Sequence, residues 1–245
     1  MRTLKTIFLT TALLMFNPST ANAENTLDNL SQHFRARGYE IEDLFSNPRF
    51  EIYENIDKSF KTAPEIKAKD YEIYKEKIGL EEKKKNIKKF IADYDNSLSL
   101  AEKEYNIPKE IIAAIIGVES DFGKNIGKYY AFNSFVSLFI KDYKTDFALQ
   151  QLEHLLKFSK KNNIDIFELK SSYAGAIGYG QFIPSSLNQL FIGKDIYDMN
   201  NNILSVANYL SFFKKKKGSI EKSIFAYNHS DFYVRTVQEL AESGK

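Results

Sequence analysis

The sequence predicts a mainly α-helical protein. Apolar residues recur at intervals of three and four over much of the chain, most clearly at 111–116, and no apolar–polar alternation persists long enough to predict a strand. Glycine and proline break the pattern early in the chain, at Gly38, Pro48 and Pro64. We expect an aromatic core, because the chain holds 20 Phe and 15 Tyr but no Trp.

The first residues indicate an export signal. Residues 1–5 are basic, residues 7–16 are apolar, and Ala21-Asn22-Ala23 supplies a small-x-small cleavage site. The apolar run is too short to span a bilayer, so residues 1–23 are interpreted as a cleaved signal peptide. The absence of Cys excludes disulfides and the lipid-anchored form of an exported protein. We therefore expect a soluble protein outside the cytoplasm, without stable membrane insertion.

Charge and composition exclude several partners. Loss of the leader removes only Arg2 and Lys5 and leaves 32 basic against 32 acidic residues. Without a basic excess, nucleic acid is not an expected partner. The three His are scattered and no acidic loop resembles a calcium site, so we expect no metal and no cofactor. The lysines at 83–85 and 88–89 are interpreted as a solvated helix face.

The apolar periodicity and the cap residues predict a succession of helices. In the first half of the chain we expect short helices over 27–74, one continuous helix from Ile87 to Ala101, and a helix over 106–123. In the second half we expect helices over 145–160, 166–171 and 203–210, a helix that starts at Gly218-Ser219, and a last helix capped by Ser230. The lysines at 214–217 are interpreted as a solvated turn.

The helix over 106–123 is the centre of the prediction. Asn106 can cap it, Pro108 suits its first turn, and Gly123 can end it. Glu119 lies on its apolar stripe and in its last turn. Desolvation and the nearby helix carbonyls both disfavour the ionised form, which predicts a raised pKa and an acid that can donate a proton. The alternative is a last-turn glutamate that turns out to water.

A glycine-rich stretch follows at 171–186. Three of the 11 Gly lie within 175–180, which lets the backbone approach a ligand closely. Tyr179, Gln181 and Phe182 flank these glycines and could stack on and hydrogen-bond a sugar. The spacing matches neither a dinucleotide nor a phosphate loop, and a tight structural turn is the alternative. Asn228, between two helices, offers an amide to a ligand or caps a helix.

Three motifs together resemble the MltB family of lytic murein transglycosylases. They are Glu119-Ser120 with Gly123, the run SYAGAIGYGQFIPSS at 172–186, and Tyr227-Asn228. The resemblance implies a lysozyme-like helical catalytic core with additional N-terminal and inserted helices. On that basis the domains are 24–95, an N-terminal helical region, and 96–245, the core with a helical insertion at about 140–171.

The resemblance also implies a reaction and a site. The enzyme would be a periplasmic lyase that cleaves the β-1,4 bond between N-acetylmuramic acid and N-acetylglucosamine of peptidoglycan and forms a 1,6-anhydro ring. It would act on glycan strands as a monomer, without a cofactor. Glu119 would be the single acid and base, and the groove would be lined by Ser172, Gln181, Phe182, Tyr227 and Asn228.

The sequence departs from the family at two places. Tyr143-Lys144 stands where better-known members have an Arg pair, and only residues 191–198 are found where some relatives insert a calcium loop.

Two other functions stay open at this point. The chain could be a muramidase that uses water, which needs a second carboxylate, or a non-catalytic peptidoglycan-binding scaffold. Asp121 is two residues from Glu119, roughly on the opposite side of the helix, and is a poor second catalyst.

Overall fold

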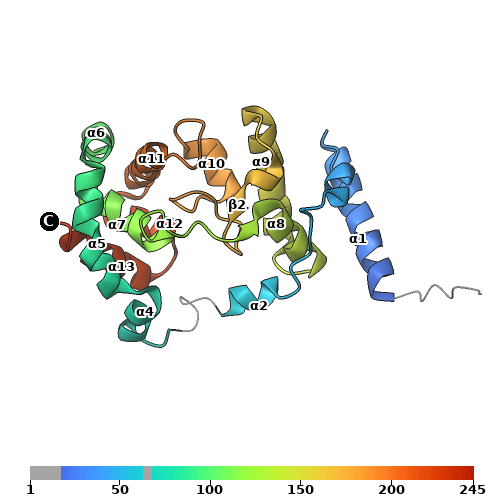
Figure 1. Cartoon of the computed structure of the whole chain (residues 1–245), viewed down its shortest axis with the longest axis horizontal. Helices are drawn as coiled ribbons and strands as arrows, with labels where there is room; N and C mark the ends of the chain where they lie inside the picture. The colour runs from blue at the N-terminus through green and yellow to red at the C-terminus, as the bar shows by residue number, and fades with distance from the viewer. Residues whose placement is uncertain (1–17, 63–67) are drawn as a thin grey trace, which may run out of the picture. The chain divides into compact units, whose positions relative to one another are not determined.

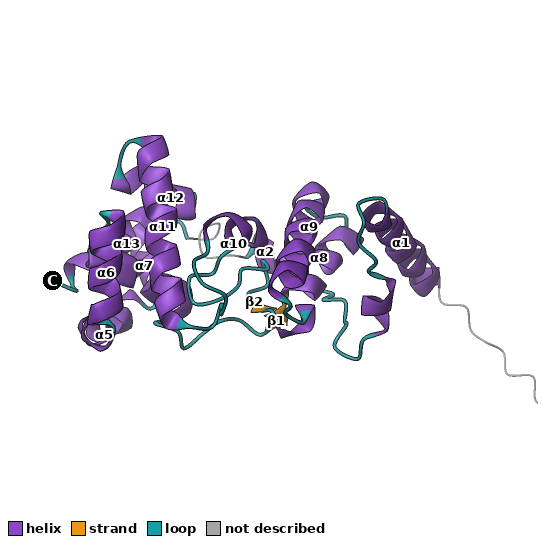
Figure 2. Ribbon diagram, turned by 90° about the horizontal axis from the view of Figure 1, so that it is seen from above, coloured by secondary structure: helices purple, strands orange, loops and turns teal. Residues whose placement is uncertain are grey.

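Helices make up nearly all of the regular structure (Figure 2). The structure, a computed structural model, describes residues 18–62 and 68–245. It divides into two compact units, Met1–Ser46 and Asn47–Lys245. The mainly α fold class is confirmed. None of the described helices combines the length and the apolar character needed to cross a membrane.

The first unit contains helix α1, Pro18–Arg35, and the short 3-10 helix η1, Glu42–Ser46. Leu30, Phe34 and Ile41 are fully buried. The predicted signal peptide falls mostly outside the described residues, which begin at Pro18, and its cleavage stays a prediction.

The second unit holds the remaining elements. Its helices are α2 (Ile56–Lys61), α4 (Tyr71–Ile78), α5 (Leu80–Asp93), α6 (Asp95–Tyr105), α7 (Lys109–Ser120), α8 (Ala131–Ile140), α9 (Thr145–Asn162), η2 (Ile166–Glu168), α10 (Pro184–Leu190), α11 (Met199–Lys217), α12 (Ile220–Tyr227) and α13 (Asp231–Glu242). Its strands are β1 (Tyr129–Tyr130) and β2 (Lys170–Ser171), which pair antiparallel.

Helix α7 is the central helix of the second unit (Figure 1). It packs against α5, α6, α11 and α13. Residues 112–116, an uninterrupted run of Ile and Ala, are all fully buried. A helix enclosed on several sides buries apolar side chains around its whole circumference, and this places the end of α7 inside the protein.

A second group of helices lies beside this bundle. Helix α9 packs against both α8 and α10. Strand β1 leads into α8, and β2 leads out of η2 into the glycine-rich segment. The pairing of Tyr129 with Ser171 therefore brings the start of that segment next to the loop that follows α7.

Several predicted helix boundaries are wrong. The continuous helix expected from Ile87 to Ala101 breaks at Tyr94 into α5 and α6. Asn106 ends α6 in a left-handed conformation, with a φ of 54°, and does not cap α7. Pro108 holds the N-cap position with a non-helical ψ of 133°, so α7 begins at Lys109.

Two further predictions differ from the structure. The lysines at 214–217 are the last turn of α11, which ends at Gly218 with a φ of 92°. Lysine is a good helix former, so glycine decides the end of the helix. Residues 166–171 form η2 and β2 because Ser171 pairs with Tyr129. The helix start at Gly218-Ser219 and the cap at Ser230 are confirmed, since α12 begins after Ser219 and the Ser230 side chain accepts the N–H of Tyr233. The domain boundary at 95/96 stays a prediction.

Candidate functional site

Glu119 lies in the last turn of α7 and is half-buried. The next residue, Ser120, holds the turn that follows: its hydroxyl donates to the carbonyl of Ile116 at 3.1 Å and accepts from the N–H of Gly123 at 3.0 Å. Ser120 is buried, so both contacts are shielded from water. This explains why a serine and a glycine stand one and four positions after Glu119.

Helix α7 ends in two consecutive left-handed residues. Asp121 and Phe122 have φ values of 51° and 59°, and they fold the chain back on the helix. The Phe122 ring then packs on Gly117: a Cβ added to this glycine would lie only 2.6 Å from the nearest atom of the ring. A larger residue than glycine at 117 would displace the ring and the turn.

One tyrosine contacts the Glu119 carboxylate, and the charge of this carboxylate affects the pKa of two others. The Tyr233 hydroxyl, from α13, donates to Oε1 of Glu119 at 2.5 Å. Burial raises the pKa of Tyr233 well above its usual value, and the Glu119 charge raises it further, so Tyr233 keeps its proton. Burial and the same charge raise the pKa of Tyr227 well above its usual value and that of Tyr209 to about 12.

Glu119 faces a cavity of about 450 Å³ in the second unit. Its lining residues come from α7, the loop after it, β1 and the glycine-rich segment, and they are Glu119, Asn125, Gly127, Lys128, Tyr129, Ser172, Tyr173 and Gln181. Among these described residues, Glu119 is the only carboxylate. The remaining groups are hydroxyls, amides, aromatic rings and one ammonium, a composition suited to a polar, uncharged ligand such as a sugar.

The two walls of the cavity are locked together at Gly127. Its N–H donates to the side chain of Asn125 at 3.1 Å. Its φ is 86°, and a Cβ there would lie 2.1 Å from the carbonyl oxygen of Ser171. Only glycine allows the loop after α7 to approach the backbone beside Ser172 so closely.

The structure brings three of the predicted site residues together around the cavity: Glu119, Ser172 and Gln181. Ser172 accepts the N–H of Ala176 at 3.3 Å. Gln181 has a φ of 49°, and its amide donates to the carbonyl of Gly178 at 2.9 Å. The glycine-rich segment is therefore a folded loop that presents both side chains to the cavity.

Two predicted residues, Tyr227 and Phe182, do not line the cavity but pack next to residues of the glycine-rich segment. Tyr227, the last residue of α12, donates to the carbonyl of Gly180 at 2.6 Å, next to Gln181. Phe182 is only 2% exposed, and its ring contacts those of Tyr209 and Tyr227. In this structure the Phe182 ring is packed in the protein, so stacking of that ring on a sugar is not supported.

The other two predicted residues lie outside the cavity lining. A Cβ on Gly123 would lie 3.3 Å from the Tyr179 ring and 2.8 Å from the end of Met199, so Tyr179 packs on the turn after α7. Asn228 is half-buried and caps the C-terminus of α12, which is the structural alternative given for it above.

The cavity continues into an aromatic cluster. The Tyr173 ring, in the lining, makes an edge contact with Phe60 of α2 at a centroid distance of 5.1 Å. Phe60 also contacts Tyr143, and the ammonium of Lys144 lies 4.9 Å from its ring centroid. The Tyr143-Lys144 pair, found where the family has arginines, thus joins this aromatic cluster.

Other carboxylates near α7 are held elsewhere. Asp121 pairs with Lys83 at 3.3 Å and with Lys124 at 3.6 Å. Asp142 accepts from the hydroxyl of Thr145 at 3.0 Å. Neither lines the cavity. Within the described ranges, no group of three or more His, Asp or Glu could hold a metal ion.

The sequence analysis missed Tyr233 and several lining residues, Asn125, Lys128, Tyr129 and Tyr173 among them. For Tyr233 there was a signal, because it stands four residues before Val237 and seven before Leu240, on the inward face of the last helix. Tyr173 stands in the 172–186 motif beside Ser172, which is a signal for it. For Asn125, Lys128 and Tyr129 there was none, since their positions depend on the pairing of β1 with β2.

The fold and the cavity define a helical, lysozyme-like protein with one acidic side chain in its cleft. A family model described as "Transglycosylase SLT domain" matches residues 22–221, and the chain belongs to this family. The membrane-bound lytic murein transglycosylase B of Escherichia coli is 36% identical over 136 residues, which cover 53% of this chain and 38% of that protein. The match thus spans about two fifths of that curated relative.

Solved structures of lytic transglycosylases share the fold. SltB3 from Pseudomonas aeruginosa, in complex with NAG-anhNAM-pentapeptide, gives a TM-score of 0.79 at 18% identity and covers 91% of this chain and 79% of that one. Slt35 from E. coli, in complex with calcium, gives a TM-score of 0.74 at 22% identity, with coverage of 91% and 92%. The resemblance and the lysozyme-like fold are confirmed.

Proposed function

We propose that this protein is a lytic murein transglycosylase, which cleaves the β-1,4 bond between N-acetylmuramic acid and N-acetylglucosamine and forms 1,6-anhydro-N-acetylmuramic acid. The observation that carries the proposal is the single carboxylate, Glu119, in a cavity otherwise lined by polar and aromatic groups. Most glycoside hydrolases use a second carboxylate, about 5–5.5 Å or 6.5–9.5 Å from the first, as nucleophile or base. Asp121 and Asp142 are engaged elsewhere.

The reaction needs one group that serves as acid and then as base. Glu119 first gives its proton to the glycosidic oxygen as the bond from that oxygen to the anomeric carbon breaks. The sugar's own acetamido group stabilises the positive charge that develops on the anomeric carbon. Glu119 then takes the proton of the 6-hydroxyl, whose oxygen closes the anhydro ring on the same carbon. Atoms and charges balance without water or a cofactor.

The surrounding residues have distinct roles in this proposal. Tyr233 holds Oε1 of Glu119, which leaves Oε2 to exchange the proton with the substrate. Ser172 and Gln181 offer a hydroxyl and an amide to the sugar, and Tyr227 fixes the backbone next to Gln181. Asn228 stays a candidate for the acetamido group.

The location and organisation of the protein are part of the proposal. Residues 1–23 would direct export to the periplasm and be removed there, and the mature monomer would act on peptidoglycan strands. The structure of SltB3 with a peptidoglycan fragment supports this substrate class. Residues 24–95 would form the N-terminal region and residues 96–245 the catalytic core.

The reaction is tested by digestion of purified sacculi in water enriched in heavy oxygen. Mass spectrometry should find 1,6-anhydromuropeptides without the label. Glu119→Gln should keep the fold and lose about 100- to 10,000-fold in turnover, the usual contribution of an acid–base group. Labelled reducing ends would identify a muramidase, and an absence of soluble products would identify a binding scaffold. If Glu119→Gln digests sacculi at the parental rate, Glu119 is not the catalyst.

A further inference from the structure

Two lysine-rich stretches in this chain differ in how their charges are compensated. On α5, Lys84 pairs with Glu81 and with Glu239 of α13, at 2.8 and 2.7 Å. The other paired lysines of this helix are Lys83 with Asp121, Lys85 with Glu82 and Lys89 with Asp93. The solvated face predicted for this run is thus a face of ion pairs, with Lys83 buried.

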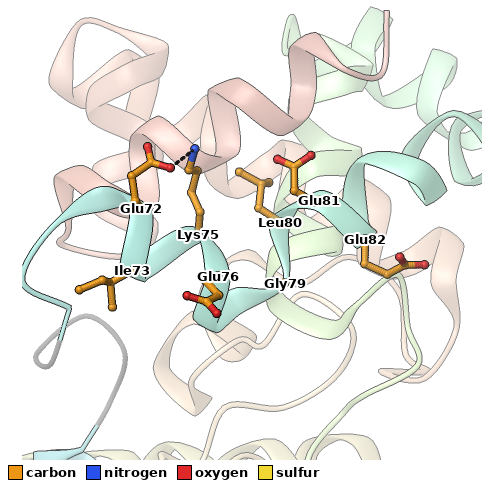
Figure 3. Close-up of a pocket in the computed structure, with 8 residues that line it drawn as sticks. All are labelled: Glu72, Ile73, Lys75, Glu76, Gly79, Leu80, Glu81 and Glu82. Carbon is orange, nitrogen blue, oxygen red and sulfur yellow. Dashed lines mark ion pairs between the residues drawn. The ribbon is translucent and has the colours of Figure 1, made fainter.

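Glutamates of α4 and α5 line a cavity of about 540 Å³ between these two helices (Figure 3). Its lining includes Glu72, Glu76, Glu81 and Glu82. Lys75 pairs with Glu72 at 2.8 Å, as the dashed line in Figure 3 marks. On α5, Glu81 and Glu82 are followed by five lysines, and four of these lysines are compensated by ion pairs.

The end of α11 shows no such compensation. Lys214 donates to the carbonyl of Asn106 at 2.9 Å, and Lys215, Lys216 and Lys217 are exposed. Within the described ranges, none of these three forms an ion pair or a side-chain hydrogen bond. Three adjacent ammonium groups therefore stand in solvent without a protein anion.

The structural role of these lysines is limited. Cations in the last turn of a helix interact favourably with its carbonyls, which accounts for the presence of one or two lysines. Successive residues of an α-helix lie about 100° apart, so four lysines in a row surround the whole helix end. Like charges this close repel one another. A fully basic helix end is thus more than the helix requires.

The basic end is remote from the catalytic carboxylate. The rings of Tyr209 on α11 and Tyr227 on α12 contact each other at a centroid distance of 4.5 Å, beside Glu119. Lys217 is eight residues beyond Tyr209, about 12 Å along the helix axis. None of the lysines at 215–217 is among the residues that line the Glu119 cavity.

Two more exposed lysines lie at this end, each beside an exposed glutamate, Lys103 next to Glu104 and Lys222 next to Glu221, so the excess of positive charge stays with the lysines at 215–217. Helices α6 and α11 run side by side: Ser97 contacts Asn200 near their starts, and Lys214 contacts Asn106 at their ends. Exposed Lys103, in the last turn of α6, lies at the same end. Exposed Lys222 follows in the first turn of α12.

We propose that the joint end of α11 and α12, with the lysines at 215–217 at its centre, docks the protein on a surface of anionic phospholipid headgroups. The contact is electrostatic and peripheral, and it needs no inserted segment. Three adjacent exposed lysines, which form no ion pair with any described residue, complement a densely charged anionic surface. A single glycan strand carries its carboxylates farther apart and fits these lysines less well.

The test is binding of the full chain to vesicles, measured by co-sedimentation. Vesicles with phosphatidylglycerol should bind the parental protein, and pure phosphatidylcholine vesicles should not. The triple variant Lys215→Gln, Lys216→Gln, Lys217→Gln should bind about 100-fold more weakly, since each lysine near such a surface strengthens binding about fivefold. Parental binding should also fall steeply as salt is added.

A matched control removes the same charge elsewhere. Lys85→Gln, Lys88→Gln, Lys89→Gln changes three exposed lysines of α5 and should bind the vesicles as the parent does. Equal losses in both triple variants would show that only net charge matters and would overturn the proposal. Vesicle binding unchanged in the α11 variant, with binding to sacculi reduced instead, would assign the surface to the cell wall and also overturn it. Digestion of sacculi by both variants reports separately on the proposed activity.

Discussion

The Tyr233 hydroxyl donates a hydrogen bond of 2.5 Å to Oε1 of Glu119, across 114 positions of sequence. It joins α13, the last helix, to the end of the central helix α7. The contact is part-buried, because Tyr233 is only 1% exposed and Glu119 is half-buried. A donor that keeps its proton fixes one carboxylate oxygen, so the proposed proton exchange is confined to the other oxygen.

Tyr233→Phe should lower kcat about tenfold or more and leave KM nearly unchanged. The substitution removes one hydroxyl and keeps the ring, and hydrogen bonds to charged groups are worth about 1.5–3 kcal/mol. Steady-state kinetics on soluble glycan strands measures the effect. Tyr209→Phe is the control, because its hydroxyl donates to the carbonyl of Ala226 at 2.7 Å and not to Glu119. Comparable kcat losses in both variants would mean that Tyr233 acts only through stability.

Gly127→Ala should destabilise the protein by about 3 kcal/mol or more and disturb the cavity. The new Cβ would need the backbone of Ser171 to move, in addition to the left-handed strain. Gly79→Ala is the matched control for Gly127→Ala, because Gly79 also has a positive φ, 69°, but nothing lies within 4 Å of the added Cβ. This substitution should lower the free energy of unfolding by about 1 kcal/mol. For a domain of this size the melting temperatures should fall by about 6–12 °C and 2–4 °C. Equal shifts would show that the close approach of the two walls does not matter.

Much of the fold could be predicted from the sequence because the strongest signals were local. The apolar run of α7 and the serine caps of α12 and α13 depend on neighbours within one or two turns. The errors arose where backbone conformation outweighed apolar periodicity. Tyr94 interrupts a helix whose apolar pattern is continuous, and Asn106 serves the helix before it and not the one after.

The candidate site was less predictable, because long-range pairing builds it. Glu119, Ser172 and Gln181 were found from motif residues, and they share the cavity. Lys128 and Tyr129 line it because β1 pairs with β2 over 40 residues later, which no local pattern indicates. Phe182 was predicted as a binding residue because an aromatic beside glycines can stack on sugar, but its ring fills the core behind Tyr227.

Chelators should leave the activity within about twofold of the untreated rate. The similar Slt35 structure contains calcium, but within the described ranges this chain has no group of three His, Asp or Glu placed to hold a metal. The measurement compares digestion of sacculi before and after dialysis against EDTA, followed by return of calcium or magnesium. Activity that is lost in EDTA and restored by a divalent cation would reveal a metal site.

The ion pair between Lys84 and Glu239 should make stability depend on pH in acid. The hydrogen bond from Lys84 is the main reason that the pKa of Glu239 lies below its usual 4.5, and a hydrogen bond from Tyr71 lowers this pKa further. A group whose pKa is lower in the folded state contributes stability above its unfolded pKa, and this contribution is lost as the pH falls through the folded pKa. Glu239 is partly exposed to solvent, so the contribution should be at most about 1 kcal/mol.

Glu239→Gln should therefore lower the melting temperature by about 1–4 °C at pH 6–7, and the difference from the parent should shrink as the pH falls below 4.5 and vanish once the pH is below the folded pKa of Glu239. Thermal unfolding followed by circular dichroism between pH 3 and 7 measures both curves. Glu221→Gln is the control, because Glu221 is exposed and forms no ion pair within the described ranges. Its melting curve should match the parent at every pH. A difference for Glu239→Gln that persists undiminished at pH 3 would assign the effect to packing and not to the charge of Glu239.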